Sequence, residues 1–464
     1  MARNKQAAGR GWPAYVAAGP MLFFSGQYGV GPRAQEYRER FDEVAGLGPG
    51  ANGRFAWINR MEGPVGAQAI AIYERYRGLL AAEGGDFESL VRYHILQRDK
   101  RFFPVFDRVR RHYETAPPAS TAVGVGRFEP HDRARLCVDA IALRPSAAGT
   151  LGARSVLPGS SKHAAAAHFS HVIGAGPYLF LAGQIPIDTS RPGAPLIRNY
   201  DDIPEEGRFL RAGRSHEDTR NGPIAAQAWF TYDLIRRHLE AEGSSLGEIL
   251  NLTVYLQDMR DFPTFHRVHE RFFPSSPPAL TVVEVGEVGH KGTLIEIEPT
   301  AILPGKGIAR RAHAPKGWTA PAHMSPLVEA GGVAFLSGIA GLDASGAPIK
   351  SMRALPVAQR RTLAGQPAVA RTPVSLQLAA ILAELATRLA TAGHGLGRVV
   401  HLTLFIDDIA AFLPMEPLLA RAFGRRRPAL TVIESPWPAP VAGARVSATA
   451  IAWLGAGAPT AARS

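Results

Sequence analysis

Apolar β-branched residues alternate with small or polar ones along one stretch of the chain, and the same pattern returns twice more. Residues 271–304 are predicted to contain a helix end, a Pro-Pro turn, a strand over 279–285 and, after a glycine turn, a second strand over 293–303. Related turn-and-strand segments occupy residues 112–126 and 423–436. A pattern that recurs three times predicts a repeat architecture before any single residue is considered.

An apolar strand opens each copy and ends at a glycine turn. The three glycines, Gly26, Gly183 and Gly338, recur at intervals of 157 and 155 residues. The polar segments that follow them lack a hydrophobic period, so we predict loops, of which the longest covers residues 188–221. This long segment is interpreted either as a lid over a site or as a tolerated surface insertion.

Helical periodicity begins after a proline in every copy and ends at a glycine. Proline suits the first helical turn, where its missing N–H is not needed, and glycine suits the residue that follows the last turn. A strand, a second helix and two further strands complete each copy. The prolines are Pro64, Pro223 and Pro373, and the glycines are Gly84, Gly243 and Gly393.

The repeat predicts three α+β domains, at residues 12–145, 165–304 and 320–455. The connections over 144–165 and 304–320 are rich in Pro, Gly and Ala and are expected to be linkers, and the last ten residues are expected to form a loose tail. A sheet with helices on one face must bury its other face. We therefore expect the three sheets to pack about a threefold axis and form a pseudo-trimer within one chain.

Composition narrows the possible functions. The chain has 464 residues, 46% of them hydrophobic, without an uninterrupted apolar run of about 18 residues, so we expect a globular protein that spans no membrane. The N-terminus lacks an apolar signal segment, and the single cysteine, Cys137, excludes an internal disulfide and fits the cytoplasm. The net charge is +12, but the basic residues are scattered, so nucleic-acid binding is not expected.

Five motifs carry a resemblance to a known family. They are Ser-Gly-Gln after an apolar strand (25–27), LQDMRDF (256–262), FFP…PPA (272–279), VEV (283–285) and IEIE (295–298). Together they resemble the Rid family, also called the YjgF or L-PSP endoribonuclease-like family, over nearly the whole chain as three tandem copies. The resemblance implies a chorismate-mutase-like fold and small-molecule sites in clefts between units, with no cofactor and no metal. It also implies hydrolysis of 2-imino acids, which many members perform.

The chain departs from that family at the position that binds the substrate carboxylate. In the deaminases an arginine directly follows the Pro-Ala turn and grips the carboxylate with two parallel hydrogen bonds. Here Ser120, Leu280 and Leu430 occupy this position, and no other basic side chain stands there in the motif. The expected substrate is therefore not a simple 2-imino acid.

The resemblance nevertheless implies a set of site residues. The family's glutamate in the last strand falls on Glu296, while Cys137 and Ser447 replace it in the other copies. The candidate catalytic residues are Glu296, His266, Cys137, Asp107 and Glu416, and the candidate substrate-binding residues are Gly183, Gln184, Phe169, His168, Gly26, Gly338 and Ser120.

Several of these residues also have a plain structural interpretation. Glu296 and Glu298 share one face of their strand, where they could be an acid and a base with separated pKa values or part of a solvated surface. His266 and His269 lie three apart on a helix and could shuttle a proton, but no further ligand stands at a metal-binding spacing. Cys137 could be a nucleophile or a small buried hydrophobic residue.

Our leading hypothesis is a small-molecule enzyme that acts on a C–N or C–O bond by acid–base hydrolysis or elimination in a cleft between domains. Glu296 would be the main acid or base, His266 would assist, and the backbone of Gly183 would polarise the substrate. The alternative is a non-catalytic ligand-binding protein or scaffold with decayed sites. A ribonuclease activity ranks last, because no His-His or His-Lys pair has a recognisable spacing. We expect a cytoplasmic monomer.

Overall fold

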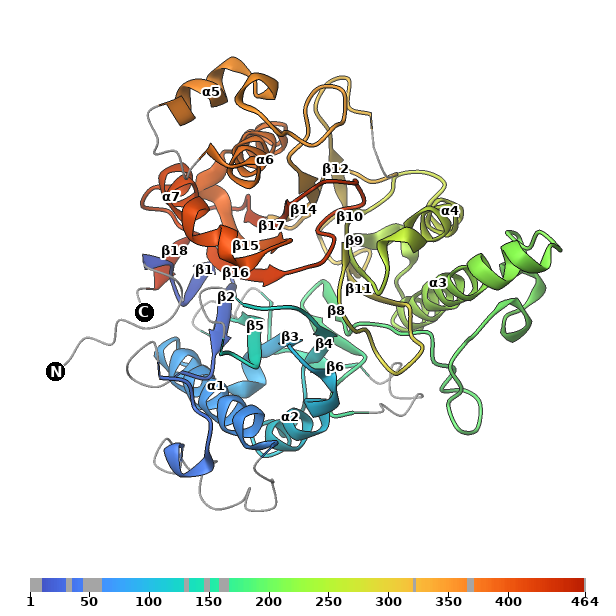
Figure 1. The fold of residues 1–464 in the computed structure, drawn as a ribbon. Helices are drawn as coiled ribbons and strands as arrows, with labels where there is room; N and C mark the ends of the chain where they lie inside the picture. The colour runs from blue at the N-terminus through green and yellow to red at the C-terminus, as the bar shows by residue number, and fades with distance from the viewer. Residues whose placement is uncertain are drawn as a thin grey trace.

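The computed structural model describes residues 11–30, 36–44, 61–128, 133–145, 151–157, 167–319, 323–364 and 371–462. Three six-stranded sheets lie towards the middle of the molecule and the long helices lie outside them (Figure 1). All three sheets have the same strand order. From one edge to the other it runs through a short edge strand, the two strands of a hairpin, the last strand of the unit, the strand between the two main helices of the unit and the strand after its second main helix. The chain is thus built from three copies of one α+β unit, as the repeated pattern predicts.

The three units have matching elements. The first contains β1 Tyr15–Ala18, β2 Met21–Tyr28, α1 Gly63–Ala82, β3 Leu90–Gln97, α2 Phe103–Arg110, β4 Ala119–Gly124 and β5 Leu136–Leu143. The second contains β6 Ser155–Val156, β7 Val172–Ala175, β8 Tyr178–Leu181, α3 Ser215–Ala241, β9 Ile249–Leu256, α4 Phe262–Phe272, β10 Ala279–Glu284 and β11 Ile295–Ile302. The third contains β12 Arg311–His313, β13 Leu327–Ala330, β14 Val333–Ala340, α5 Val357–Ala364, α6 Pro373–Ala390, β15 Val399–Ile406, α7 Phe412–Phe423, β16 Ala429–Glu434, β17 Val446–Trp453 and β18 Thr460–Ala462.

The recurring glycine interrupts the sheet in every unit. The β2–β5 ladder shifts register between Phe24 and Gln27, and the β14–β17 ladder shifts between Leu336 and Ile339. In the second sheet β8 ends before Gly183, and Gln184 pairs with Ile297 as an isolated bridge. A bulge bends a strand and re-aims its side chains. The break at Gly183 therefore brings the backbone close to the neighbouring strand β11.

The sheets bury both faces. On the outer face the helices cover each sheet and form three separate apolar cores. On the inner face a fourth core draws side chains from all three sheets, among them Phe23, Phe180 and Phe335. Because a half-covered sheet cannot leave its apolar face in water, this shared core joins the three units.

The structure corrects the prediction of a loop over residues 188–221. Helix α3 begins at Ser215, so Pro223 lies inside it and not in its first turn. The early start is stabilised because the carboxylate of Asp218 accepts the backbone N–H groups of Ala212 and Gly213, at 2.8 and 3.0 Å. Acidic groups in the first turn also interact favourably with the positive end of the helix dipole. The proline prediction is confirmed for α1 and α6, which carry proline within their first two residues.

The predicted linkers and tail contain short edge strands. Strand β6 pairs with β7 and β12 pairs with β13, and β18 returns from the end of the third unit to pair with β1 of the first (Figure 1). An open strand edge carries unpaired N–H and C=O groups, which these segments satisfy. The expectation of a loose tail is therefore wrong for residues 460–462. Residues 146–150 and 158–165 of the first predicted linker lie outside the described residues.

In the described part of the chain, helix α6 is the one helix whose length and apolar composition would allow it to cross a membrane. More than half of it, 56%, is buried within the molecule, where Leu376, Ile381 and Leu385 join the core of the third unit. This burial is typical of a core helix.

Candidate functional site

A cavity of about 400 Å³, here the first cavity, is lined by residues of the first and second units. Lys100, Asp107 and Ser120 face it from the first unit, and Gly183 and Glu296 face it from the second. Its lining further includes Phe169, His171, Gln184, His238 and His290. The cavity thus brings together six of the residues that the sequence proposes as site residues: Asp107, Ser120, Phe169, Gly183, Gln184 and Glu296.

Glu296 is the carboxyl group of this cavity. Strand β11 holds its side chain at 4% exposure, and Oε2 accepts the backbone N–H of Gly289 at 3.4 Å. A Cβ at Gly183 would lie 2.1 Å from Glu296 Oε1, so only glycine leaves room for the carboxyl group. Burial raises the pKa of Glu296 above its usual value, although the charge of Lys100 opposes the shift. A buried carboxyl group with a raised pKa is suited to proton transfer.

Lys100 supplies the cation of the cavity, and the sequence analysis missed it. It lies in the turn after β3, and its Nζ atom donates a hydrogen bond to the carbonyl oxygen of Ala122. Burial lowers the pKa of Lys100 below its usual value, although the charge of Glu296 opposes the shift. The corresponding turns hold the buried apolar residues Met259 and Ile409. Aligning the three turns would have revealed a charge in one copy alone.

A second basic side chain reaches Ser120 from outside the motif, although no basic residue occupies the family's arginine position itself. Arg110 of α2 donates from Nη1 to Ser120 Oγ at 3.2 Å, and from Nε and Nη2 to Asp107 Oδ1 at 2.9 and 2.6 Å. Arg110 is only 1% exposed and does not line the first cavity. Its charge is therefore already paired within the protein.

Asp107 lines the cavity but is held as an anion. Burial by itself would raise its pKa, yet the neighbouring Arg110 and the backbone N–H of His168 hold the pKa of Asp107 below its usual value. That N–H donates to Asp107 Oδ1 at 2.9 Å, and His168 Nε2 lies 3.0 Å from the carbonyl oxygen of Glu114. Asp107 and His168 thus tie segments together, which does not support the acid–base role predicted for Asp107.

Three of the predicted binding residues, Gly183, Gln184 and Phe169, line the first cavity, but the first two are already hydrogen-bonded within the protein. The N–H of Gly183 donates to the carbonyl oxygen of Ser120 at 3.2 Å, so it is not free to polarise a substrate as expected. Gln184 is tied to Ala182 through its side chain, at 2.9 Å. Phe169 lines the cavity with its ring 5.0 Å from that of His171. The cavity wall therefore consists of ordered, internally bonded groups.

Cys137 is a buried hydrophobic residue. It is 0% exposed in β5 and belongs to an apolar cluster with Tyr28 and Phe128. Burial raises the pKa of its thiol well above the usual value, which disfavours the nucleophilic thiolate. A Cβ at Gly26 would lie 2.6 Å from its sulfur, so this predicted binding glycine accommodates Cys137.

Two other predicted catalytic residues are not brought to Glu296. His266 lies on α4 with Nδ1 3.8 Å from Glu270, and Glu416 lies on α7. Neither lines the first cavity. The expectation that His266 assists Glu296 is corrected, because α2 of the first unit, and not α4, packs over this carboxyl group.

A larger cavity of about 670 Å³, here the second cavity, is lined by residues of the second and third units. Gly338 faces it as predicted. Leu280 stands where the family has its arginine, and Ser447 stands where Glu296 stands in the first cavity. The two cavities therefore share a place in the repeat but not their chemistry.

Three threonines connect the three sheets in a cycle at the centre of the molecule. Each threonine lies on the fourth strand of one unit and donates to a side chain on the last strand of the next unit. The pairs are Thr121 with Glu298, Thr281 with Thr449 at 3.0 Å, and Thr431 with Asp139 at 2.7 Å. The cycle matches the threefold repeat of the chain.

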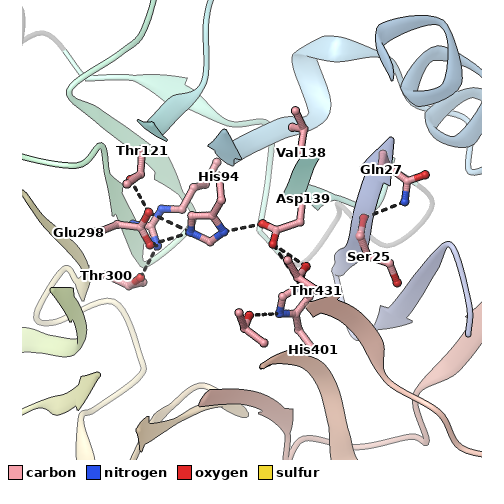
Figure 2. A network of polar contacts seen from close by, with 12 residues as sticks. Ser25, Gln27, His94, Thr121, Val138, Asp139, Glu298, Thr300, His401 and Thr431 are labelled. Carbon is pink, nitrogen blue, oxygen red and sulfur yellow. Dashed lines mark hydrogen bonds and ion pairs between the residues drawn. The ribbon is translucent and has the colours of Figure 1, made fainter. Parts of the chain in front are cut away.

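Ionised groups accompany this cycle, and Figure 2 shows His94 between two carboxylates. Arg92 Nη1 lies 3.2 Å from Glu298 Oε1 and donates to Thr300 at 2.8 Å. Although burial alone would raise it, Arg92 and His94 hold the pKa of Glu298 below its usual value. Glu298 is therefore a structural anion, and only Glu296 of the predicted carboxylate pair faces the first cavity.

Three copies of one α+β unit, with a buried carboxyl group in a cavity, define a repeat protein with a candidate small-molecule site. The family described as Endoribonuclease L-PSP matches residues 159–303. A RutC family protein of Pyrococcus horikoshii is 36% identical over 133 residues, which are 29% of this chain and 85% of the relative. The chain belongs to this family, the Rid (YjgF/L-PSP endoribonuclease-like) family.

Two further relatives extend the comparison. A protein of Escherichia coli K12 named 2-iminobutanoate/2-iminopropanoate deaminase is 37% identical over 82 residues, 17% of this chain and 63% of the relative. The crystal structure of RidA from the Antarctic bacterium Psychrobacter sp. PAMC 21119 is 23% identical, covers 32% of this chain and 97% of its own, and has a TM-score of 0.24.

Proposed function

We propose that the first cavity is the catalytic site of a small-molecule enzyme, and that it acts by acid–base hydrolysis or elimination at a C–N or C–O bond. The observation that carries the proposal is the buried carboxyl group of Glu296, whose pKa is raised, in a cavity that it shares with Lys100. Perturbed carboxyl groups in cavities are typical of catalytic sites, although ion-pair networks also produce them. The name of the Escherichia coli relative supports chemistry at a C=N bond.

For a C=N substrate whose nitrogen carries a proton, Glu296 exchanges protons in three steps. Ionised Glu296 takes a proton from a water molecule as the water oxygen forms a bond to the imine carbon and the electron pair of the C=N double bond moves to the nitrogen. The protonated carboxyl group then gives this proton to the nitrogen. The C–N bond breaks with its electron pair on the nitrogen while Glu296 takes the proton of the new hydroxyl group, so an amine and a carbonyl compound leave, and Glu296 finally releases that proton to solvent. Lys100 holds an anionic group of the substrate as a point charge.

The substrate proposed here differs from a simple 2-imino acid. Lysine offers one charge without the two-pronged geometry of arginine, and Arg110 is already bonded to Asp107. The anionic group would therefore bind near Ala122, where Lys100 Nζ lies, and not at Ser120. We further propose that the three units form a pseudo-trimer, with the catalytic cavity between two of them, and that the protein is a cytoplasmic monomer.

The proposal is tested with imines generated in solution by an amine oxidase from a panel of amines, some of which carry a carboxylate away from the amine carbon, with semicarbazide trapping of the imine that survives. Glu296→Gln should reduce hydrolysis by at least about 100-fold, since a positioned acid–base group contributes that much. Glu205→Gln, at a side chain that is 90% exposed, is the control. Equal hydrolysis by wild type and Glu296→Gln would sink the proposal and favour a non-catalytic ligand-binding protein.

A further inference from the structure

We propose that the second cavity binds a small monocarboxylic acid with an apolar body and does not convert it. This site is separate from the first cavity and does not depend on the catalytic proposal. Its wall contains a buried arginine, a buried indole N–H without an acceptor among the described residues, and several apolar side chains. Together these features match an anionic group attached to a hydrocarbon.

Arg388 is the cation of the second cavity. Helix α6 holds it at 3% exposure, where Nε donates to Glu384 at 2.8 Å and Nη1 donates to the carbonyl oxygen of Ser337 at 2.9 Å. Among the described residues, no hydrogen bond is found for Nη2. Because Ser337 directly precedes Gly338, which lines the cavity, the guanidinium group stands beside the glycine turn of this unit.

The position of Arg388 distinguishes the two cavities. It follows the buried Gln377 of α6 by eleven residues, as His238 follows the buried Gln227 of α3. His238 lines the first cavity and Arg388 lines the second, so the same helix position carries a different group in each. At this shared helix position the second cavity therefore has a guanidinium group where the first cavity has an imidazole ring.

One buried donor in the wall points to a missing acceptor. Trp318 Nε1 is buried without a hydrogen-bond acceptor in the described part of the chain. Gln359 Oε1 is also buried without a partner there, but it is itself an acceptor and does not contribute to binding an anion. The indole of Trp318 lies over Arg388, with 4.8 Å from the guanidinium carbon to the ring centre. Buried polar groups are ordinarily paired. An acceptor placed beside Arg388 would be close to the indole as well.

The charges favour a monocarboxylate. The guanidinium group and the indole are donors, which suit a carboxylate, but Glu384 already neutralises part of the positive charge, which disfavours a phosphate dianion. The surrounding wall is apolar and suits a hydrocarbon or an aryl group. It includes Phe262, Leu280, Val282, Met324, Ile339 and Val441.

The described wall of the cavity has no counterpart of Glu296 or Lys100, and its carboxyl group Glu384 is paired with Arg388. Ser447 stands in place of Glu296, and the turn that carries Lys100 in the first unit carries the buried Met259 in the second. Asp343 caps its own loop, where Ser345 donates two hydrogen bonds to its carboxylate, and these bonds hold its pKa below the usual value. Binding without turnover follows.

Isothermal titration of the full chain with phenylacetate tests the proposal, with inorganic phosphate as the second probe. Phenylacetate should bind and phosphate should not, and Arg388→Gln should weaken phenylacetate binding by at least tenfold. Because Arg388 is buried, a second variant is needed: Ala383→Trp fills the cavity from α6 and leaves Arg388 in place, and it should also abolish binding.

Variants of the first cavity complete the design. Lys100→Met and Glu296→Gln should bind phenylacetate as the wild type does, and wild type should return the ligand unchanged. Binding that survives both Arg388→Gln and Ala383→Trp, or that disappears in Lys100→Met, would place the ligand elsewhere and overturn the proposal. Preferential binding of phosphate, or the absence of any phenylacetate binding, would overturn it as well. Loss of hydrolysis in Glu296→Gln with retained phenylacetate binding separates this site from the catalytic one.

Discussion

His94 Nε2 lies 2.9 Å from the carboxylate of Glu298, although 204 residues separate them in sequence and they belong to different units. On the other side of the ring, Nδ1 lies 2.5 Å from Asp139 Oδ1 (Figure 2). Burial opposes a charged ring, but the two carboxylates outweigh it and raise the pKa of His94 to about 10. An imidazolium ion therefore bridges two carboxylates at neutral pH and joins the first and second units.

This bridge predicts a defined dependence of stability on pH. Because the pKa of His94 is raised from 6.5 to about 10, its stabilisation is complete below pH 6.5 and is lost as the pH rises through about 10. Asp139 and Glu298 have lowered pKa values, so their contribution is lost as the pH falls below their usual range. His94→Gln should lower the free energy of unfolding at pH 7 by about 3–5 kcal/mol, because it leaves the buried carboxylate of Asp139 without its cation, whereas Glu298 keeps Arg92.

Guanidinium unfolding at pH 7, 9 and 11 measures both effects. Wild type should lose stability between pH 9 and 11, and His94→Gln should show a flatter decline. His216→Gln, at an exposed side chain, should behave as wild type. An alkaline decline of equal size in His94→Gln would show that another group titrates there.

Cys137 is predicted to be inert. Its burial in β5 and the raised pKa of its thiol imply that Ellman's reagent reacts with the native protein only on unfolding. Cys137→Ala should keep full hydrolytic activity and lose about 1 kcal/mol of stability, through a small cavity. Rapid modification of the native thiol, or loss of activity in Cys137→Ala at unchanged structure, would restore the nucleophile interpretation.

The sequence predicts the repeated unit well because its strands follow local rules. Alternating β-branched residues between glycine and proline turns correctly give strands such as β10 and β11. The start of α3 escapes prediction because a proline usually marks a first turn, whereas here Asp218 stabilises an earlier turn and Pro223 is tolerated inside the helix. The edge strand β18 escapes as well, since its partner β1 lies at the other end of the chain.

The candidate site is predicted only in part from the sequence, because some of its residues come from a different unit of the chain. Glu296 and Gly183 come from one unit and from motifs of the family, so both are found from sequence. Lys100 comes from another unit, and its approach to the cavity depends on how two units pack. A residue that follows a strand in a turn has no periodic signal of its own. Comparison of the three copies, position by position, is the signal that could have revealed Lys100.

Gly183→Ala tests the close approach at the first cavity. The added Cβ would lie 2.1 Å from Glu296 Oε1 and must displace the carboxyl group. A misplacement of about 1 Å can cost on the order of 100-fold in rate, so imine hydrolysis should fall by that amount. Gly247→Ala is the control, because its nearest neighbour, Ser245 Oγ, would lie 3.5 Å away. Full activity in Gly183→Ala would show that the position of Glu296 does not limit hydrolysis.

The pairing of β18 with β1 predicts an effect of shortening the chain. Thr460, Ala461 and Ala462 pair with Ala17, Val16 and Tyr15, so a chain that ends at residue 457 leaves the edge of β1 open. Its free energy of unfolding should fall by about 1–3 kcal/mol, as expected for a few backbone hydrogen bonds. Hydrogen exchange measured by mass spectrometry should rise in the peptide that contains residues 15–18. A chain that ends at residue 462 keeps the strand and should match the full chain in both measurements. Unchanged exchange in the shorter chain would mean that β18 adds nothing to the first sheet, and that other contacts between the first and third units, such as the shared core and the central threonine cycle, are sufficient.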